Sequence, residues 1–323
     1  MSTTKPPHRH HAGVVRRDVV IHSAGQCCEG WLYLPPGSAP HPCVVLAHGI
    51  GGIRSAALPD FASRFAAAGI SALTFDYRHL GTSEGQPRGL IDIKRQRADY
   101  RAAIEFARHV DEIDSRRIAL WGTSFGGGHV LATAARDHKI AAAIIQNPFV
   151  DGSAAAAAVI RSGGRRHAYR LAWRAARDTL AARRGSRPVW VDLAGPPGSA
   201  AMMTTPDAVA GFESILPHEP HGFEWAVPAR IVLQMRADRP AARSHLVKCP
   251  MLVCVCERDL IAPPQPAITV SRHAPRGELR CYPIGHFDLF HAPWFDRIID
   301  DQLAFLRRTL LESVPQDDAG SGR

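Results

Sequence analysis

Short apolar runs alternate with amphipathic stretches along most of the chain, and this alternation limits the possible folds more than any other feature. Strand-like runs recur at Val14–Ile21, Trp31–Leu34, Cys43–Ala47, Ser71–Phe75, Ile118–Trp121, Ala142–Ile145, Met251–Cys256 and Leu279–Ile284. The later runs are continuously apolar, as in strands that are covered on both faces of a sheet. Helical spacing of apolar residues predicts helices at Leu58–Ala68, Asp92–Val110, Phe125–Arg136, Pro264–His273 and Trp294–Leu311. This order predicts an α/β fold with a mostly parallel sheet and helices on both faces.

The alternation is interrupted once, after Pro148. The segment that follows is rich in Ala and Arg, then becomes loop-like, and the strand–helix rhythm resumes after about Val247. We interpret it as a cap that is inserted into the core and sits on the sheet. The polar composition of both ends of the chain is typical of disorder. The predicted boundaries are 14–148 and 248–314 for the core, 149–247 for the cap, and 1–13 and 315–323 for the disordered tails.

The composition is that of a globular protein. Hydrophobic residues make up 46% of the chain and charged residues 21%, which is ordinary for a chain that buries a core. No apolar run approaches the roughly 18 residues that span a bilayer, and the first residues lack the apolar segment of a secretory signal. We therefore expect a cytoplasmic protein with no membrane partner. The histidines at positions 8, 10 and 11 have no carboxylate beside them, and no clustered metal-ligand spacing occurs elsewhere, so no metal is expected.

The seven cysteines are predicted to be reduced. Their number is odd, and most of them lie in or beside apolar runs. Cys254 and Cys256 are separated by one residue, rather than by the two of a redox or zinc pair. We expect small buried thiols in a reducing compartment. The cysteines are at positions 27, 28, 43, 249, 254, 256 and 281.

The net charge is +9, and most of it is concentrated in one segment. Between Arg161 and Arg187 the chain has nine arginines and one acid, Asp178. A solvated helix face and a surface that receives an anionic partner both fit this pattern. Arginine far outnumbers lysine along the whole chain, which often reflects base composition, and no nucleic-acid partner is expected. Helical spacing places four of the arginines on one stripe: Arg166, Arg170, Arg174 and Arg177.

The motif Gly122-Thr123-Ser124-Phe125-Gly126 carries the main chemical prediction. It follows the apolar run IALW and leads into the helical run GGHVLATAAR. A sharp turn from strand to helix would expose Ser124 at the carboxyl end of the strand, and the glycines permit the crowded, strained backbone of such a turn. The helix N-terminus would supply positive potential where an oxyanion forms. Ser124 is therefore the candidate nucleophile.

A serine hydroxyl needs a base that removes its proton, and we assign this role to His286. It follows the strand-like run ELRCYPI and a turn glycine. The loop after a strand is where active-site groups lie in an open α/β sheet. His273 and His291 are the less favoured candidates, because each is better explained as a residue on a helix surface.

The acid and the oxyanion donors are assigned by their place after strands. Asp259 comes at the loop after the run MLVCVC, where it would orient the histidine and stabilise the imidazolium. Glu257 and Asp288 are rival carboxylates. The backbone N–H groups of Phe125, next to the nucleophile, and of Ile50, in the glycine-rich sequence HGIGG, are the candidate oxyanion hole.

The order Ser124, Asp259, His286, together with the sequences GTSFGG and HGIGG, resembles the α/β-hydrolase superfamily over nearly the whole chain. The stretch FDYRHLGTSEG resembles the D-Y-R-G-x-G-x-S stretch of the dienelactone-hydrolase-like, X-prolyl-peptidase-like and serine-aminopeptidase-like branches. His79 stands where that stretch has a glycine, so no substrate is carried over from any one branch. The resemblance implies an eight-stranded, mostly parallel sheet, a cap after the sixth strand, and hydrolysis of esters, thioesters or amides without a cofactor or metal.

The preferred prediction is a serine hydrolase that cleaves a carboxylic ester through an acyl-enzyme intermediate. The same side chains could serve a thioesterase, an acyltransferase or a peptidase or amidase. A non-catalytic binding protein on the same fold is less favoured, because the serine, acid, histidine and loop glycines are all present. No P-loop or dinucleotide-binding motif is found, so no nucleotide cofactor is expected.

The predicted cap should cover the site and select the substrate, a small-molecule ester or thioester. We expect its apolar residues to be divided between its own core and an acyl pocket. The arginine stripe would suit an acidic acyl carrier protein or coenzyme A. The apolar residues in question are Trp190, Val191, Leu193, Met202, Met203, Phe212, Phe223 and Trp225.

Overall fold

The computed structural model describes residues 13–312, so the predicted disordered tails, apart from Gly13, and the histidines at 8, 10 and 11 lie outside the described residues. Its main sheet has the strands β1 (Val15–Ser23), β2 (Gln26–Leu34), β3 (His41–Ala47), β4 (Ser71–Phe75), β5 (Ile113–Thr123), β6 (Ala142–Gln146), β9 (Met251–Cys256) and β10 (Gly277–Tyr282). Their order across the sheet is β1-β2-β4-β3-β5-β6-β9-β10. Only the β1–β2 and β2–β4 pairs of this sheet are antiparallel. The predicted α/β-hydrolase fold with a mostly parallel eight-stranded sheet is confirmed.

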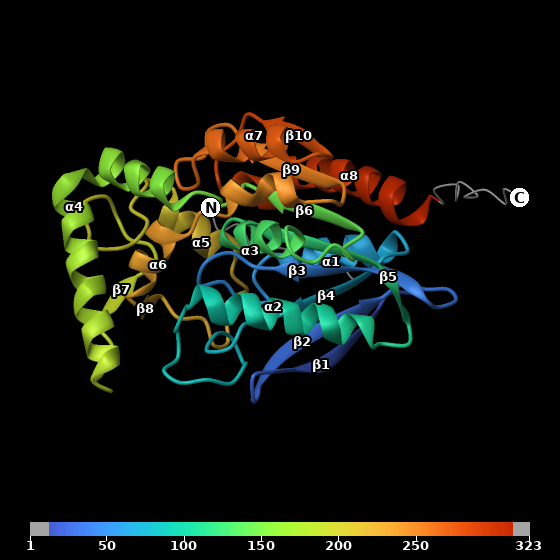
Figure 1. Cartoon of the computed structure of the whole chain (residues 1–323), viewed down its shortest axis with the longest axis horizontal. Coiled ribbons are helices and arrows are strands. Elements are labelled where there is room, and N and C mark those ends of the chain that lie inside the picture. Colours follow the sequence, from blue (N-terminus) through green and yellow to red (C-terminus); the bar gives the residue numbers. More distant parts are fainter. Residues whose placement is uncertain (1–12, 313–323) are drawn as a thin grey trace, which may run out of the picture.

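Helices cover both faces of this sheet, as the continuously apolar strands predicted. On one face lie α2 (Ile93–Arg108), α3 (Phe125–Ala134) and α7 (Pro264–His273), and on the other lie α1 (Leu58–Ala67) and α8 (Trp294–Leu306). Side chains of neighbouring β3 residues point to opposite faces of the sheet. Val45 belongs to the hydrophobic core on the first face, whereas Val44 and Leu46 belong to the core on the second. Figure 1 shows α2 and α3 in front of the sheet.

Between β6 and β9 the chain leaves the sheet and builds a separate group of elements. They are α4 (Gly152–Arg183), β7 (Trp190–Asp192), α5 (Ala208–Ile215), β8 (Ala226–Pro228), α6 (Ile231–Ala237) and the short helix η1 (Pro240–Leu246). β7 and β8 pair as a small antiparallel sheet. α4 changes direction at Gly164, whose φ is 78°, and its second part forms the outer left edge of the molecule in Figure 1. Among residues 13–312, no helix is both long and apolar enough to cross a membrane.

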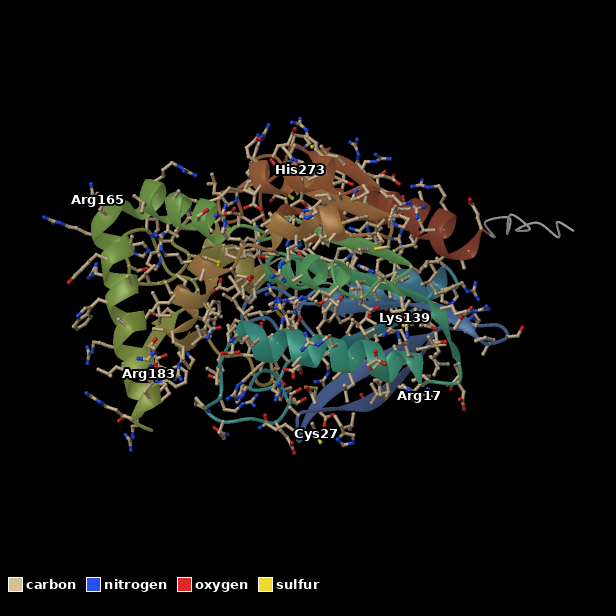
Figure 2. The ribbon with its side chains drawn as sticks, in the orientation of Figure 1. Arg17, Cys27, Lys139, Arg165, Arg183 and His273 are labelled. Atoms are coloured by element: carbon tan, nitrogen blue, oxygen red, sulfur yellow. The ribbon has the colours of Figure 1, made fainter. Side chains whose placement is uncertain are left out.

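The one acid of the arginine-rich segment, Asp178, points inward. Its side chain is fully buried and accepts hydrogen bonds from Arg230 Nε at 2.7 Å and from the backbone N–H groups of Arg230 and Val189, each at 2.9 Å. This carboxylate therefore joins α4 to the start of α6. Arginines on the outer side of α4 are exposed. Figure 2 labels two of them, Arg165 and Arg183, near the two ends of the second part of the helix.

The seven cysteines are all free. The prediction that they are buried is correct for five of them: Cys28, Cys43, Cys249, Cys254 and Cys256. It is wrong for Cys281, which is exposed, and only partly right for Cys27. Cys281 lies on β10, the last strand of the sheet, where one side of the strand has no neighbour to cover it.

Candidate active site

Ser124 occupies the tight turn between β5 and α3. Its φ of 52° and ψ of −120° form a backbone conformation that residues with a Cβ rarely adopt. The glycines on either side make the turn possible. A Cβ at Gly122 would lie 2.5 Å from the carbonyl oxygen of Gly126, and a Cβ at Gly126 would lie 2.4 Å from that of Ala47. The Ser124 N–H donates to the carbonyl of Gln146 at 2.9 Å, which fixes the turn against β6.

Asp259 and His286 form a buried pair. His286 Nδ1 lies 2.6 Å from Asp259 Oδ2, and the two residues are 4% and 6% exposed. The other carboxylate oxygen, Oδ1, accepts the N–H groups of Ile261 at 2.8 Å and Ala262 at 2.7 Å. These contacts hold the carboxylate in place. With Nδ1–H donating to Asp259, the Nε2 atom of His286 is the nitrogen that can accept a proton.

The rival side chains lie elsewhere. Glu257 is exposed, and Asp288 Oδ2 accepts the N–H of Gly285 at 2.8 Å. His273 is exposed on α7, while His291 Nε2 lies 2.8 Å from a serine hydroxyl of α5. The side chains of Asp259 and His286, by contrast, lie directly against each other.

Ser124 and His286 face the same small cleft. Both line a space of about 40 Å³, together with Gly49, Ile50 and Phe287. No hydrogen bond joins the Ser124 hydroxyl to the His286 ring in residues 13–312. The structure therefore brings the nucleophile candidate and the base candidate to one space without a direct bond between them.

Asn147 is a site residue that the sequence analysis missed. It follows β6 and has a positive φ of 35°. Its Nδ2 donates to the backbone carbonyl of His286 at 3.0 Å, and its Oδ1 accepts the hydroxyl of Thr123 at 2.9 Å. The signal was available, because polar residues at the carboxyl ends of neighbouring parallel strands meet at one edge of a sheet.

The sequence HGIGG lies against the nucleophile turn. A Cβ added at Gly49 would be 3.4 Å from Ser124 Cβ. Within the described residues, the backbone N–H groups of Ile50 and Phe125 have no hydrogen-bond acceptor. His48 Nδ1 is 2.9 Å from the carbonyl oxygen of Gly49, and burial lowers the pKa of this imidazole. His48 therefore supports the loop as a neutral side chain.

A second, larger cavity opens from Ser124 toward the segment between β6 and β9. It has a volume of about 440 Å³, which is large enough for a small organic ligand. Arg236 is the one charged side chain among its lining residues. The apolar part of the wall comes from α4, α6 and neighbouring loops: Phe149, Ala155, Ala156, Val159, Ile160, Leu171, Ala172, Met202, Met203, Val232, Leu233, Met235, Ile261 and Ala262. No group of three metal-ligating side chains is found in the part of the chain that the structure describes.

Comparison with known proteins identifies the family. Residues 38–298 match the family described as serine aminopeptidase, S33. The quorum-quenching protein AidA of Acinetobacter baumannii (strain MDR-ZJ06) is 41% identical over 291 residues, which are 90% of this chain and 94% of that protein. The crystal structure of the α/β hydrolase GrgF from Penicillium sp. sh18 superimposes with a TM-score of 0.76 at 25% identity, covering 92% of this chain and all of GrgF. DcsB, solved with a substrate analogue, gives 0.76 at 22% identity, with the same coverage. The chain belongs to the serine aminopeptidase S33 family of α/β hydrolases.

Proposed function

We propose that this protein is a serine hydrolase that cleaves carboxylic esters of apolar acyl groups through an acyl-enzyme intermediate. The observation that carries the proposal is the buried Asp259–His286 pair, at 2.6 Å, which faces the same cleft as Ser124. A hydroxyl on a strained turn, an imidazole held by a carboxylate, and unbonded N–H groups beside them are the parts that acyl transfer requires.

In the proposed first step, the Ser124 Oγ attacks the acyl carbon while His286 Nε2 accepts the hydroxyl proton. Asp259 keeps the other ring nitrogen protonated and stabilises the imidazolium. The N–H groups of Phe125 and Ile50 bind the oxyanion. The tetrahedral intermediate collapses, the bond from the acyl carbon to the leaving oxygen breaks, and the leaving group takes the proton from His286.

In the proposed second step, water replaces the leaving group. His286 Nε2 accepts a proton from the water molecule as its oxygen attacks the acyl carbon. Collapse of the second intermediate breaks the bond to Ser124 Oγ, which receives the proton. The products are a carboxylic acid and free enzyme, so each turnover consumes one ester and one water molecule.

The substrate class is inferred from the larger cavity. Its wall is almost wholly apolar, and it begins at Ser124. An extended aliphatic acyl group would therefore exchange water contact for contact with Val159, Met202 and Met235. Because the relative AidA is named a quorum-quenching protein, acylated signalling molecules are included among the candidate substrates of this chain.

Acyl transfer is the second candidate. GrgF is named a polyketide transferase, and another relative, AneE of Aspergillus aculeatus, is named a thiohydrolase; they match 40% and 39% of this chain respectively. The same acyl-enzyme would serve both reactions. In acyl transfer an alcohol or thiol attacks the acyl-enzyme in place of water, and in thioester cleavage a thiol is the leaving group in place of an alcohol. Thioester substrates and added alcohols therefore belong in the test.

The test is covalent labelling followed by a substrate series. A fluorophosphonate should label the wild-type protein once, Ser124→Ala should remove the label, and Ser162→Ala, on the exposed side of α4, should keep it. p-Nitrophenyl esters of increasing chain length, acyl thioesters and aminoacyl anilides then rank the substrate classes. Labelling that persists in Ser124→Ala, or hydrolysis unaffected by this change, would contradict the proposal.

A further inference from the structure

We propose that the outer face of α4 is a docking surface for an anionic lipid membrane. The surface consists of the apolar ridge Tyr169, Trp173 and Leu180 with arginines along both sides, and we call it the α4 ridge. It contains none of the proposed catalytic residues, so the proposal does not depend on the proposed reaction.

The ridge is continuous along the helix. Its three members are spaced by four and seven residues, which places them on one line of an α-helix. They are 70%, 51% and 46% exposed. The buried residues His167, Leu171, Ala175 and Asp178 mark the opposite side of the same helix. Large apolar side chains are thus turned outward on a helix that already has a buried face.

Arginines lie on both sides of the ridge. The helical angle places Arg165 and Arg183 on one side of it, and Arg166, Arg170 and Arg177 on the other. All five are exposed, and none has a carboxylate partner among the described residues. Figure 2 shows Arg165 and Arg183 at the two ends of this outer helix. The guanidinium of Arg177 also lies 4.6 Å from the centre of the Trp173 ring.

The α4 ridge adjoins the apolar cavity. Tyr169 belongs both to the ridge and to the cavity lining, and other residues of α4 also line the cavity. Ile160 and Leu233 line the same cavity and are 43% and 39% exposed. A lipid surface that contacts the ridge would bring these partly exposed lining residues close to molecules dissolved in its outer layer.

A membrane fits this surface better than a second copy of the chain. In a two-fold dimer the ridge would face itself, and the arginines of one copy would meet those of the other without any carboxylate between them. Helices with aromatic residues in the apolar strip and arginines beside it bind at the headgroup layer, where the rings enter and the guanidinium groups pair with phosphates. Tyr169 and Trp173 are more than half exposed, as insertion of their rings between headgroups requires. This proposal departs from the sequence-based expectation of no membrane partner.

An acidic acyl carrier protein, the partner expected from the sequence, is the competing occupant. It would satisfy the arginines, but it would also have to supply an apolar surface for Tyr169, Trp173 and Leu180. We therefore make carrier binding an outcome of the experiment.

The experiment uses the full chain carrying Ser124→Ala, so that no lipid is cleaved. Vesicles of phosphatidylcholine alone, and of phosphatidylcholine and phosphatidylglycerol in equal amounts, are sedimented with the protein. We expect binding to the anionic vesicles, little binding to the neutral ones, and loss of binding at high salt. Arg166→Glu with Arg170→Glu should lower the partition coefficient by about tenfold or more. Trp173→Ala should lower it by about tenfold.

Two controls match these changes in kind. Arg272→Glu with Arg276→Glu reverses two exposed arginines near the end of α7, and Trp225→Ala removes an indole that is 40% exposed and lies outside α4. Both should bind as the parent does. Equal losses in the controls, absence of vesicle binding, or tighter binding to an acidic carrier protein than to vesicles would each overturn the proposal. So would a dimer in sedimentation velocity that dissociates on Trp173→Ala.

Discussion

Asn147 donates its Nδ2 hydrogen bond to the backbone carbonyl of His286 at 3.0 Å, and thereby ties the end of β6 to the loop after β10. The same side chain accepts the hydroxyl of Thr123, the residue before Ser124. One amide thus connects the turn of the candidate nucleophile to the loop of the candidate base. The distance between the two groups depends on this connection as well as on the Asp259 contact.

Replacing Asn147 with Ala should lower kcat by about a hundredfold, because small displacements of a reacting group are costly, while KM changes little. Steady-state kinetics on a p-nitrophenyl ester measure both constants. Thr123→Val is the matched control, since it removes one bond of Asn147 but leaves the bond to His286, and should cost less. An unchanged kcat in Asn147→Ala would show that Asp259 alone positions the histidine.

The fold was predictable because its determinants are local. Each buried strand carries its own apolar run, and the sequence around Ser124 shows its strand, its turn glycines and its helix within one continuous segment. Asp259 and His286 were predictable for a similar reason, because each comes in the loop directly after a strand-like run. Asn147 was missed because its role depends on the loop after β10, which is distant in sequence. The inward direction of Asp178 was missed for a similar reason: its partner, Arg230, is 52 residues away, and no helical spacing indicates it.

Replacing Asp259 with Asn should lower kcat by about 10³ to 10⁴ and slow fluorophosphonate labelling in parallel. An amide at this position can donate to His286 Nδ1, which favours the tautomer whose Nε2 carries the hydrogen and cannot act as a base. Stopped-flow measurement of the nitrophenol burst follows the acylation step directly. Asp288→Asn changes a carboxylate two residues from the histidine that does not bond to it, and should have a much smaller effect. Similar losses in both variants would remove Asp259 from its assigned role.

Replacing Val159 with Trp should shorten the range of acyl chains that the enzyme accepts. Val159 lies on α4 and lines the apolar cavity. The indole ring of Trp is larger than the Val side chain, so it would fill space that the distal part of a long acyl chain would otherwise occupy. We expect kcat/KM for a long-chain p-nitrophenyl ester to fall by about tenfold to a hundredfold, within the range that pocket volume supplies, with acetate turnover nearly unchanged. Leu180→Trp, on the exposed side of α4, is the control. Parallel losses on short and long esters would place the acyl chain elsewhere.

Replacing Asp178 with Ala should destabilise the segment between β6 and β9. The change leaves the partly buried guanidinium of Arg230 without its carboxylate, at 2.7 Å, and leaves two backbone N–H groups without an acceptor. Loss of one partner of a buried ion pair costs about 3–5 kcal/mol. Urea unfolding measures the free energy, and limited proteolysis should cut first within 184–207. Asp178→Asn keeps the shape and part of the hydrogen bonding, so it should lose less; equal losses would mean that the charge alone matters.

Acid should destabilise the protein through His79. This residue is 2% exposed, and burial together with the nearby Arg95 guanidinium lowers its pKa to about 4. Its Nδ1 lies 3.2 Å from the carbonyl of Pro87 and its Nε2 lies 3.1 Å from an Arg95 nitrogen, so the neutral ring donates at one side and accepts at the other. The unfolded chain, with an ordinary histidine pKa near 6.5, takes up the proton first. Stability is therefore complete above about pH 6.5 and falls progressively down to about pH 4.

The variant that tests this is His79→Asn, because asparagine tolerates the positive φ of 70° at this position better than most side chains. Between about pH 7.5 and pH 5.5 the His79 contribution to the loss of unfolding free energy is about 1.4 kcal/mol. The difference between wild type and variant in urea unfolding should shrink by this amount over that interval. His48 and His129, whose pKa values burial also lowers, act in the same direction in both proteins and cancel in the comparison. A constant difference at both pH values would mean that the His79 ring is protonated in the folded protein, with Arg95 moved away from its Nε2.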